Sequence, residues 1–149
     1  IVADYLDFEQ YKSAISKYFS TNSVDILVNN TQGPNPGTVA QKSEEDYLQA
    51  FNLLFQNAVV TTNLALKRMK KIGFGRIINV SSMTVKEPQD NLVLSNTMRT
   101  ALVSWSKSLS NDVAKNNINA LNLYDKLGFV KVGVHKDYWK MCYEFKINQ

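Results

Sequence analysis

Hydrophobic residues recur every three or four positions in three stretches of the chain. The stretches predict amphipathic helices at residues 8–19, 43–73 and 95–116. Asp7 with Gln10, and Ser43 with Asp46, stand three residues apart at the start of the first two stretches, which is the spacing of a helix capping box. The chain therefore carries local start signals for its first two helices.

Short continuous apolar runs separate these helices. The runs DILVNN at 25–30 and GRIINVSS at 75–82 predict strands covered on both faces of a parallel sheet. An apolar opening, IVADYL at 1–6, comes before the first helix. The order strand, helix, strand, long helix, strand, helix predicts an α/β fold with a partial doubly wound, Rossmann-like parallel sheet.

The end of the chain follows a different pattern. Residues 119–127 predict a short helix that stops at Gly128, and FVKVGVH at 129–135 predicts a strand. In WKMCYEFKI at 139–147 apolar and polar residues alternate, which favours a half-exposed antiparallel pair of strands. We therefore expect two segments, 1–117 and 118–149, with the second packed on the first.

Composition narrows the classes of function. With a single Cys142 and a single His135, neither an internal disulfide nor a usual zinc site can form, so no metal is expected. No apolar run approaches the roughly 20 residues that cross a bilayer, so we expect no membrane partner and a cytoplasmic location. The net charge of +4 includes a cluster at 67–71, KRMKK, at the end of a predicted helix. There cations complement the helix dipole, so we expect a solvated helix end, with phosphate binding the alternative, and no nucleic acid partner.

Three motifs together resemble the short-chain dehydrogenase/reductase family, in particular a divergent branch similar to 3-oxoacyl-carrier-protein reductases. The motifs are DILVNNTQGPNPG, GRIINVSSMTVKEP and NLVLSNTMRTAL, in that order. The resemblance implies NAD(P) as the cofactor, with Asp4 beside the adenine and Asn29 and Asn30 opening the cofactor cleft. Gly33 follows them as a fourth expected cofactor-binding residue. Ser82 is implied to polarise a substrate carbonyl.

The catalytic positions depart from the family pattern. Ser95 stands where the family has its tyrosine, Arg99 where it has its lysine, and Leu54 where it has a helix asparagine. A serine hydroxyl is a poor general acid, whereas Arg99 keeps its charge and can bind ribose or phosphate. The candidate catalytic residues are thus Ser82, Ser95 and Arg99, with Ser95 and Arg99 facing the carboxyl end of the 75–82 strand. The alternative is that Ser95 lies near a helix N-cap and Arg99 in solvent.

The family holds the cofactor pyrophosphate on a glycine-rich turn, and no glycine precedes Gly33 in this chain. The front of the family fold is thus expected to be missing ahead of Ile1. We expect weak or absent NAD(P) binding and an oxidoreductase segment that is non-catalytic as it stands, a pseudoenzyme. Whether the chain is an enzyme stays open at this point.

The sequence from Asn119, NALNLYDKLGFVKVGVHKDYW, resembles a second family, the GCN5-related N-acetyltransferases. That resemblance implies a general acid at Tyr124, although a core tyrosine on an amphipathic helix is the simpler alternative. The two patterns join near residues 116–119, as in a chimera. Two other functions stay open: a binding or oligomerisation module that forms a homodimer through helices 43–72 and 95–116, and an N-acetyltransferase remnant.

Overall fold

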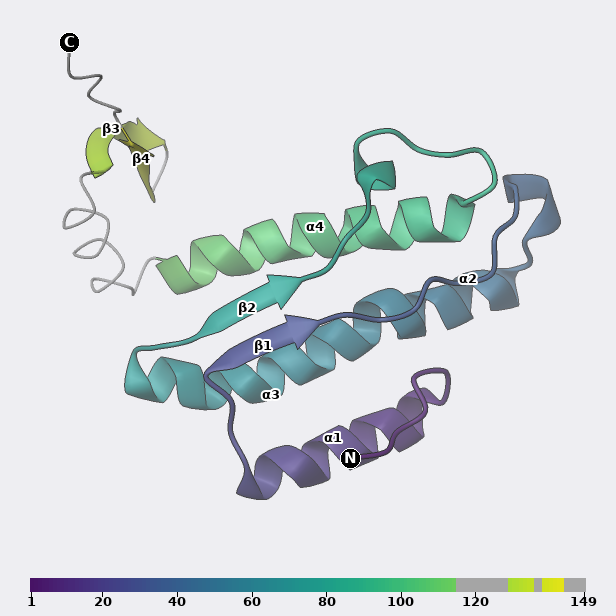
Figure 1. Cartoon of the computed structure of the whole chain (residues 1–149), viewed down its shortest axis with the longest axis horizontal. Coiled ribbons are helices and arrows are strands. Elements are labelled where there is room, and N and C mark those ends of the chain that lie inside the picture. The colour runs from purple at the N-terminus through teal and green to yellow at the C-terminus, as the bar shows by residue number, and fades with distance from the viewer. Residues whose placement is uncertain (115–128, 136–137, 144–149) are drawn as a thin grey trace, which may run out of the picture. The chain divides into compact units, whose positions relative to one another are not determined.

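The computed structural model of the chain describes residues 1–114, 129–135 and 138–143 (Figure 1). The chain divides into two compact units, Ile1–Trp105 and Ser106–Gln149, which are described separately. The expected segment boundary between residues 117 and 118, the helix at 119–127 and Tyr124 lie outside the described residues. Within the described ranges, no helix has the length and apolar character needed to cross a membrane.

Helix α1 (Phe8–Thr21) begins as the sequence predicts. The side chain of Asp7 accepts a hydrogen bond from the backbone N–H of Gln10 at 3.0 Å. The reciprocal half of the predicted capping box does not form, because the Gln10 side chain accepts from the N–H of Asp4 at 2.9 Å instead. Gln10 therefore fixes the turn ahead of the helix rather than the helix cap itself.

The predicted long helix is one continuous rod with a wider turn in its middle. It consists of α2 (Glu44–Phe51), a π-helical turn η2 (Asn52–Gln56) and α3 (Asn57–Ile72). Ser43 and Asp46 form the predicted capping box, and the rod ends at Gly73, whose φ of 67° lies in the left-handed region that glycine tolerates. Lys70 and Lys71 lie in the last turn, as the helix dipole favours.

Helix α4 (Val93–Ala114) begins two residues before the predicted start at Ser95. The carbonyl of Leu92 accepts from the backbone N–H of Asn96 at 2.8 Å, which closes the first helical turn ahead of Ser95. Ser95 therefore lies inside the first turn of α4. The predicted end at residue 116 lies outside the described residues.

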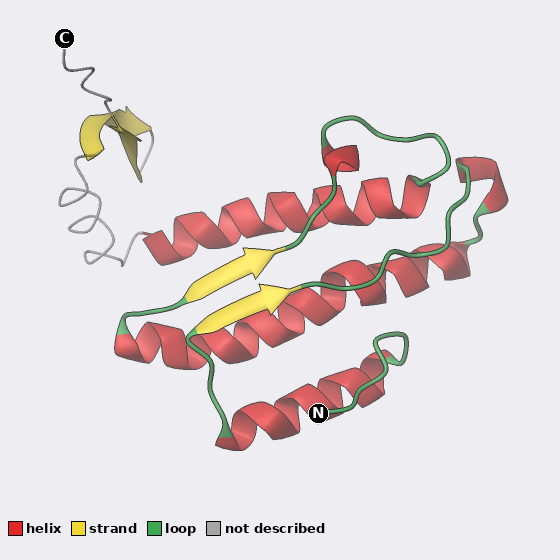
Figure 2. Ribbon diagram, viewed as in Figure 1, coloured by secondary structure: helices red, strands yellow, loops and turns green. Residues whose placement is uncertain are grey.

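Strands β1 (Ile26–Asn29) and β2 (Arg76–Asn79) form a parallel pair with Val28 opposite Ile78, which confirms an α/β fold with a parallel sheet (Figure 2). The apolar opening at 1–6 was expected to begin the strand–helix alternation, but it forms no strand, and Val2 is 99% exposed. A strand needs a neighbour for its backbone hydrogen bonds, and none of the described residues provides one there.

The prediction of strands covered on both faces is wrong for this sheet. Along each strand, residues alternate between exposed and half-buried, and Ile26, Val28 and Ile78 lie on the exposed face. The other face meets α3, which contacts β1. The reason is that the described helices of the first unit leave this face of the sheet without a covering layer (Figure 1).

The second unit contains β3 (Phe129–His135) and β4 (Tyr138–Tyr143). They pair antiparallel, with Phe129 opposite Tyr143, and the register shifts between Lys131 and Gly133. The predicted antiparallel pair is confirmed. Its second strand begins at Tyr138, one residue before the predicted run, and the part of that run beyond Tyr143 lies outside the described residues.

Polar residues lie at the centre of the first unit. Asn57 and Thr62 of α3 are 0% exposed, among buried apolar residues such as Leu54 and Ala65. Tyr11 of α1 and Thr61 of α3 share a hydrogen bond of 2.6 Å between their hydroxyl oxygens. This bond ties α1 to α3 inside the core.

Removing this hydroxyl should weaken the fold modestly. We expect Tyr11→Phe to lower the free energy of unfolding by about 1 kcal/mol at neutral pH, since Thr61 keeps its bond to the carbonyl of Asn57. Burial is the main cause that raises the pKa of Tyr11 above its ordinary value of 10.0. Its stabilising effect is therefore present below pH 10 or so and is lost as the phenol ionises at higher pH. Urea unfolding of the wild type and of Tyr11→Phe at pH 7 and pH 11 measures the loss of stability and its pH dependence. If the free energy of unfolding changed with pH equally in both proteins, the prediction would be contradicted.

Candidate functional site

The carboxyl ends of β1 and β2 lie next to each other and carry the polar residues that the sequence singled out. Asn29 at the end of β1 donates from its side-chain amide to Asn79 at 2.7 Å and to Thr62 at 3.0 Å. These bonds join β1, β2 and α3. Asn29, which the family resemblance places at a cofactor cleft, is thus held in a cross-link between structural elements.

Ser82 lies just beyond β2 and caps the short 3-10 helix η3 (Met83–Val85). Its hydroxyl oxygen accepts hydrogen bonds from the Thr84 backbone N–H at 3.2 Å and from the Thr84 hydroxyl at 3.1 Å. Sequence analysis missed Thr84, although a serine two residues before a threonine is a known local hydrogen-bonding pattern. Because the oxygen is used as an acceptor, the Ser82 proton is left to be donated.

Ser81, next to Ser82, is a second residue that the sequence analysis did not assign. Its hydroxyl oxygen is buried and has no hydrogen-bond partner among the described residues. A buried polar group in that state calls for a partner such as water or a ligand. The strand end therefore presents two neighbouring hydroxyl groups.

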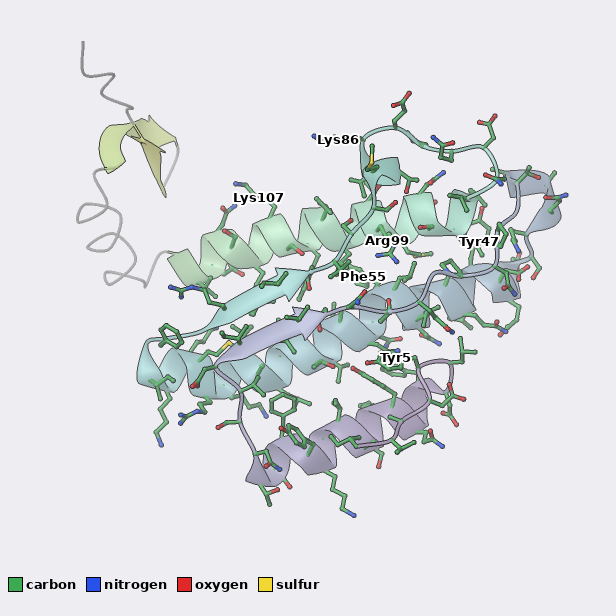
Figure 3. All side chains as sticks on the ribbon, in the orientation of Figure 1. Tyr5, Tyr47, Phe55, Lys86, Arg99 and Lys107 are labelled. Atoms are coloured by element: carbon green, nitrogen blue, oxygen red, sulfur yellow. The ribbon has the colours of Figure 1, made fainter. Side chains whose placement is uncertain are left out.

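Arg99 lies on α4 and is only 9% exposed (Figure 3). One guanidinium nitrogen donates to the backbone carbonyl of Val80 at 2.9 Å, at the end of the β2 segment. Burial lowers the pKa of Arg99 below its ordinary value. The alternative that Arg99 lies in solvent is wrong, and the predicted approach of Arg99 to the carboxyl end of this strand agrees with the contact.

Ser95 lies one turn before Arg99 on α4 and is half-buried. Whether its hydroxyl shares a cleft with Ser82 stays a prediction. Leu54, at the position of the family asparagine, is 2% exposed in the π-helical turn η2 and belongs to the apolar core. Leu54 therefore offers no polar group to this strand end.

The other residues predicted to bind the cofactor, Asp4, Asn30 and Gly33, have different surroundings. One carboxylate oxygen of Asp4 accepts from the N–H of Leu6 at 2.9 Å, within the turn ahead of α1. Asn30 is exposed just beyond β1, and the position where a Gly33 side chain would begin has open space around it. The open space leaves room for a ligand to approach the Gly33 backbone.

A cavity of about 210 Å³ lies beside β1. It is lined by apolar side chains of α1 and β1, by polar residues just beyond β1 and by a polar residue of α3, including Ile15, Phe19, Leu27, Asn30, Thr31 and Thr61. This cavity was not predictable from the sequence, because its walls come from segments far apart in the chain. Two predicted cofactor residues, Asn29 and Asn30, line this cavity. Asn29 belongs to the cross-link between β1, β2 and α3, whereas Asn30 does not.

Residues 1–141 match the short chain dehydrogenase family. The chain belongs to this family. The match runs through the expected junction at residues 116–119, and it lends no support to the acetyltransferase resemblance of the tail, which stays a prediction. The parallel strand pair and the helices around it agree with the α/β architecture of the family's solved structures.

Similar proteins include named reductases. The chain is 35% identical over 101 residues to the NADPH-dependent reductase BacG of Bacillus subtilis, covering 66% of this chain and 39% of that protein. It is 27% identical over 108 residues to the 3-oxoacyl-[acyl-carrier-protein] reductase FabG of Chlamydia pneumoniae, covering 72% and 44%. The solved structure of YwfH, an NADPH dependent reductase involved in bacilysin biosynthesis, superposes with a TM-score of 0.69 at 30% identity, covering 76% and 45%. The chain thus spans less than half the length of these relatives.

The family and its named relatives imply a nicotinamide dinucleotide. The Asn29 amide is committed to Asn79 and Thr62 and one carboxylate oxygen of Asp4 to its own turn, which leaves Asn30 and Gly33 as the expected cofactor residues without such a role. Arg99, the remaining charged candidate, is buried against Val80.

Proposed function

We propose that this chain forms the carbonyl-binding part of a short chain oxidoreductase, and that these 149 residues do not catalyse hydride transfer on their own. The Ser82 hydroxyl carries the proposal. Its oxygen accepts both bonds from Thr84, so its proton points elsewhere, and a substrate carbonyl oxygen is an acceptor that such a donor stabilises.

Proton donation is the step for which the described residues around this strand end offer no suitable group. A reductase must protonate the oxygen that gains charge when a carbonyl is reduced, and general acids work best when their pKa lies near the working pH. The Ser95 hydroxyl is far less acidic than such a general acid, and an arginine guanidinium keeps its proton in proteins. Arg99 therefore acts as a fixed positive charge near the strand end.

Carbonyl binding can be tested without a cofactor. Ethyl acetoacetate, a small 3-oxo ester, is titrated while the amide NMR signals of Ser82 and Thr84 are followed. We expect saturable shifts at both signals that Ser82→Ala removes, because the donated hydrogen bond is lost. Ser13→Ala, an exposed serine of α1, is the matched control and should leave the shifts unchanged. Equal shifts in the Ser82→Ala variant would contradict the proposal.

Cofactor binding should be weak. We expect NADH and NADPH to bind with a dissociation constant of about 1 mM or weaker, since the described residues provide no phosphate cradle. Fluorescence titration measures this, and saturation at micromolar cofactor would overturn it. For the same reason Ser95→Tyr combined with Arg99→Lys should give no carbonyl-dependent NADPH oxidation, because a proton donor without a held nicotinamide has no hydride to use.

A binding or oligomerisation module remains the second candidate. Its homodimer through residues 43–72 and 95–116 is a proposal that light scattering tests directly, since a monomer at high protein concentration would remove it. The acetyltransferase remnant is a third proposal. Acetyl transfer to a polyamine that disappears in Tyr124→Phe would support it.

A further inference from the structure

One end of the first unit carries a basic tip, residues 67–76, where α3 turns into β2 (Figure 1). Its cations are all exposed: Lys67, Arg68, Lys70, Lys71 and Arg76. Within the described residues, Arg68 forms the one ion pair of the tip, with its Nε 3.6 Å from a carboxylate oxygen of Asp25. Five cations against one carboxylate leave this surface with a net charge of +4.

Two apolar side chains protrude among these cations. Ile72 is 42% exposed and Phe74 is 47% exposed. The turn that carries them is fixed to the core, because the N–H of Phe74 donates to the carbonyl of Met69 at 3.2 Å. The backbone of Gly75 lies so close to the buried Met69 side chain that no larger residue fits there. The tip therefore holds Phe74 outward on a well-packed turn.

The helix dipole alone does not account for the basic tip. It places roughly half a negative charge at the end of a helix, and its effect falls off within the last turn. Lys70 and Lys71 in that turn already complement it. Lys67 lies a full turn before Lys71, and Arg76 lies beyond the helix in β2. The excess of positive charge around exposed apolar side chains therefore points to an anionic partner.

The apolar side chains decide which class of anionic partner fits. Single-stranded nucleic acids stack their bases on open aromatic faces. In the basic tip the Arg76 guanidinium already lies over the Phe74 ring, 5.0 Å from its centroid, and Ile72 has no ring. A bilayer surface accommodates the whole set, since lipid phosphates attract the cations and apolar side chains enter the headgroup region.

We propose that the basic tip binds the surface of a membrane that contains anionic lipids, with Ile72 and Phe74 in the headgroup region and the cations at the lipid phosphates. Such a contact lies on the bilayer without crossing it. It therefore agrees with the lack of a spanning helix among the described residues. The expectation of no membrane partner rested on the lack of a long apolar run, which a surface contact does not need.

The test is sedimentation of the full chain with vesicles of phosphatidylglycerol and phosphatidylcholine in equal parts. We expect binding that salt weakens, and none to vesicles of phosphatidylcholine alone. Each Lys or Arg near an anionic membrane strengthens binding about fivefold, so Lys70→Gln combined with Lys71→Gln should weaken it about twentyfold. Lys12→Gln combined with Lys86→Gln is the matched control, since it removes the same charge from exposed positions outside the tip. The control should bind within about twofold of the wild type.

The apolar part of the contact has its own variants. Phe74→Ser should weaken binding about fivefold, because it removes the side chain that enters the headgroup region. Phe74→Trp should bind at least as tightly as the wild type, since tryptophan favours the membrane interface. Circular dichroism shows whether each variant is folded, and the comparison of the two kinds of vesicle uses the wild type alone.

Several outcomes would overturn the proposal. Equal binding to the two kinds of vesicle, unchanged binding of the Lys70 and Lys71 double variant, or an equal loss in the control would each do so. Release of the protein from vesicles by glycerol phosphate would assign the tip to a free phosphate ligand. Tighter binding to a single-stranded oligonucleotide, lost in the same double variant, would assign it to nucleic acid.

Discussion

Replacing Asn29 by alanine should lower the free energy of unfolding by about 3 kcal/mol, whereas replacing the adjacent Asn30 should change it by less than about 0.5 kcal/mol. Asn29 donates to Asn79 and to Thr62, and Thr62 is 0% exposed. The substitution removes two hydrogen bonds at once and takes the donor from a fully buried hydroxyl. Asn30 is exposed beyond the strand and has no comparable role.

The two variants form a matched pair, since they delete the same side chain at neighbouring positions. Urea unfolding followed by circular dichroism measures both free energies. Equal losses in the two variants would mean that Asn29 is not the cross-link between β1, β2 and α3. A large loss for Asn30→Ala alone would show that the roles of the two asparagines are reversed.

Local signals in the sequence located the described helices well. Ser43 and Asp46 are three residues apart, and Gly73 follows the last apolar position, so each helix boundary is decided by a few adjacent residues. The π-helical turn at Asn52–Gln56 was not predicted, because the apolar spacing across it still reads as one helix. The strands DILVNN and GRIINVSS were located by the same kind of local pattern.

Features that depend on distant parts of the chain were not predictable. The opening at 1–6 has the composition of a strand but no neighbour with which to pair, and Ile26 is exposed because the sheet lacks a second covering layer among the described elements. A hydrophobic pattern indicates that a segment can form a strand. Whether it pairs and how deeply it is buried depend on other segments of the chain. The candidate site shows the same division: Ser82 was singled out by the family resemblance of its motif, but the hydrogen bond from Asn29 to Thr62 is visible only in three dimensions.

The burial of Arg99 was also beyond the sequence, and it gives the second large expected effect. Arg99 is 9% exposed, donates to the carbonyl of Val80, and forms no ion pair within the described part of the chain. Removing a charge from water costs several kcal/mol when no opposite charge compensates it. The single hydrogen bond to a backbone carbonyl returns about 1.5–3 kcal/mol of that. Arg99 is therefore expected to destabilise the fold relative to an apolar side chain of similar length.

Arg99→Met should accordingly raise the free energy of unfolding by about 1 kcal/mol, while Arg99→Ala should lower it by about 3 kcal/mol. Methionine fills nearly the same space without a charge, so the gain from removing the buried guanidinium exceeds the loss of the Val80 bond. Alanine also loses that bond, and it leaves a cavity between α4 and the end of β2. Arg99→Lys is the matched control, since it keeps the charge and should not gain stability. Urea unfolding of the three variants measures the set, and a loss of more than about 1 kcal/mol in Arg99→Met would show that the guanidinium stabilises the fold. A higher free energy of unfolding in Arg99→Met would instead mean that the fold does not need this charge. That result is expected if Arg99 serves to bind an anionic or carbonyl ligand at the strand end.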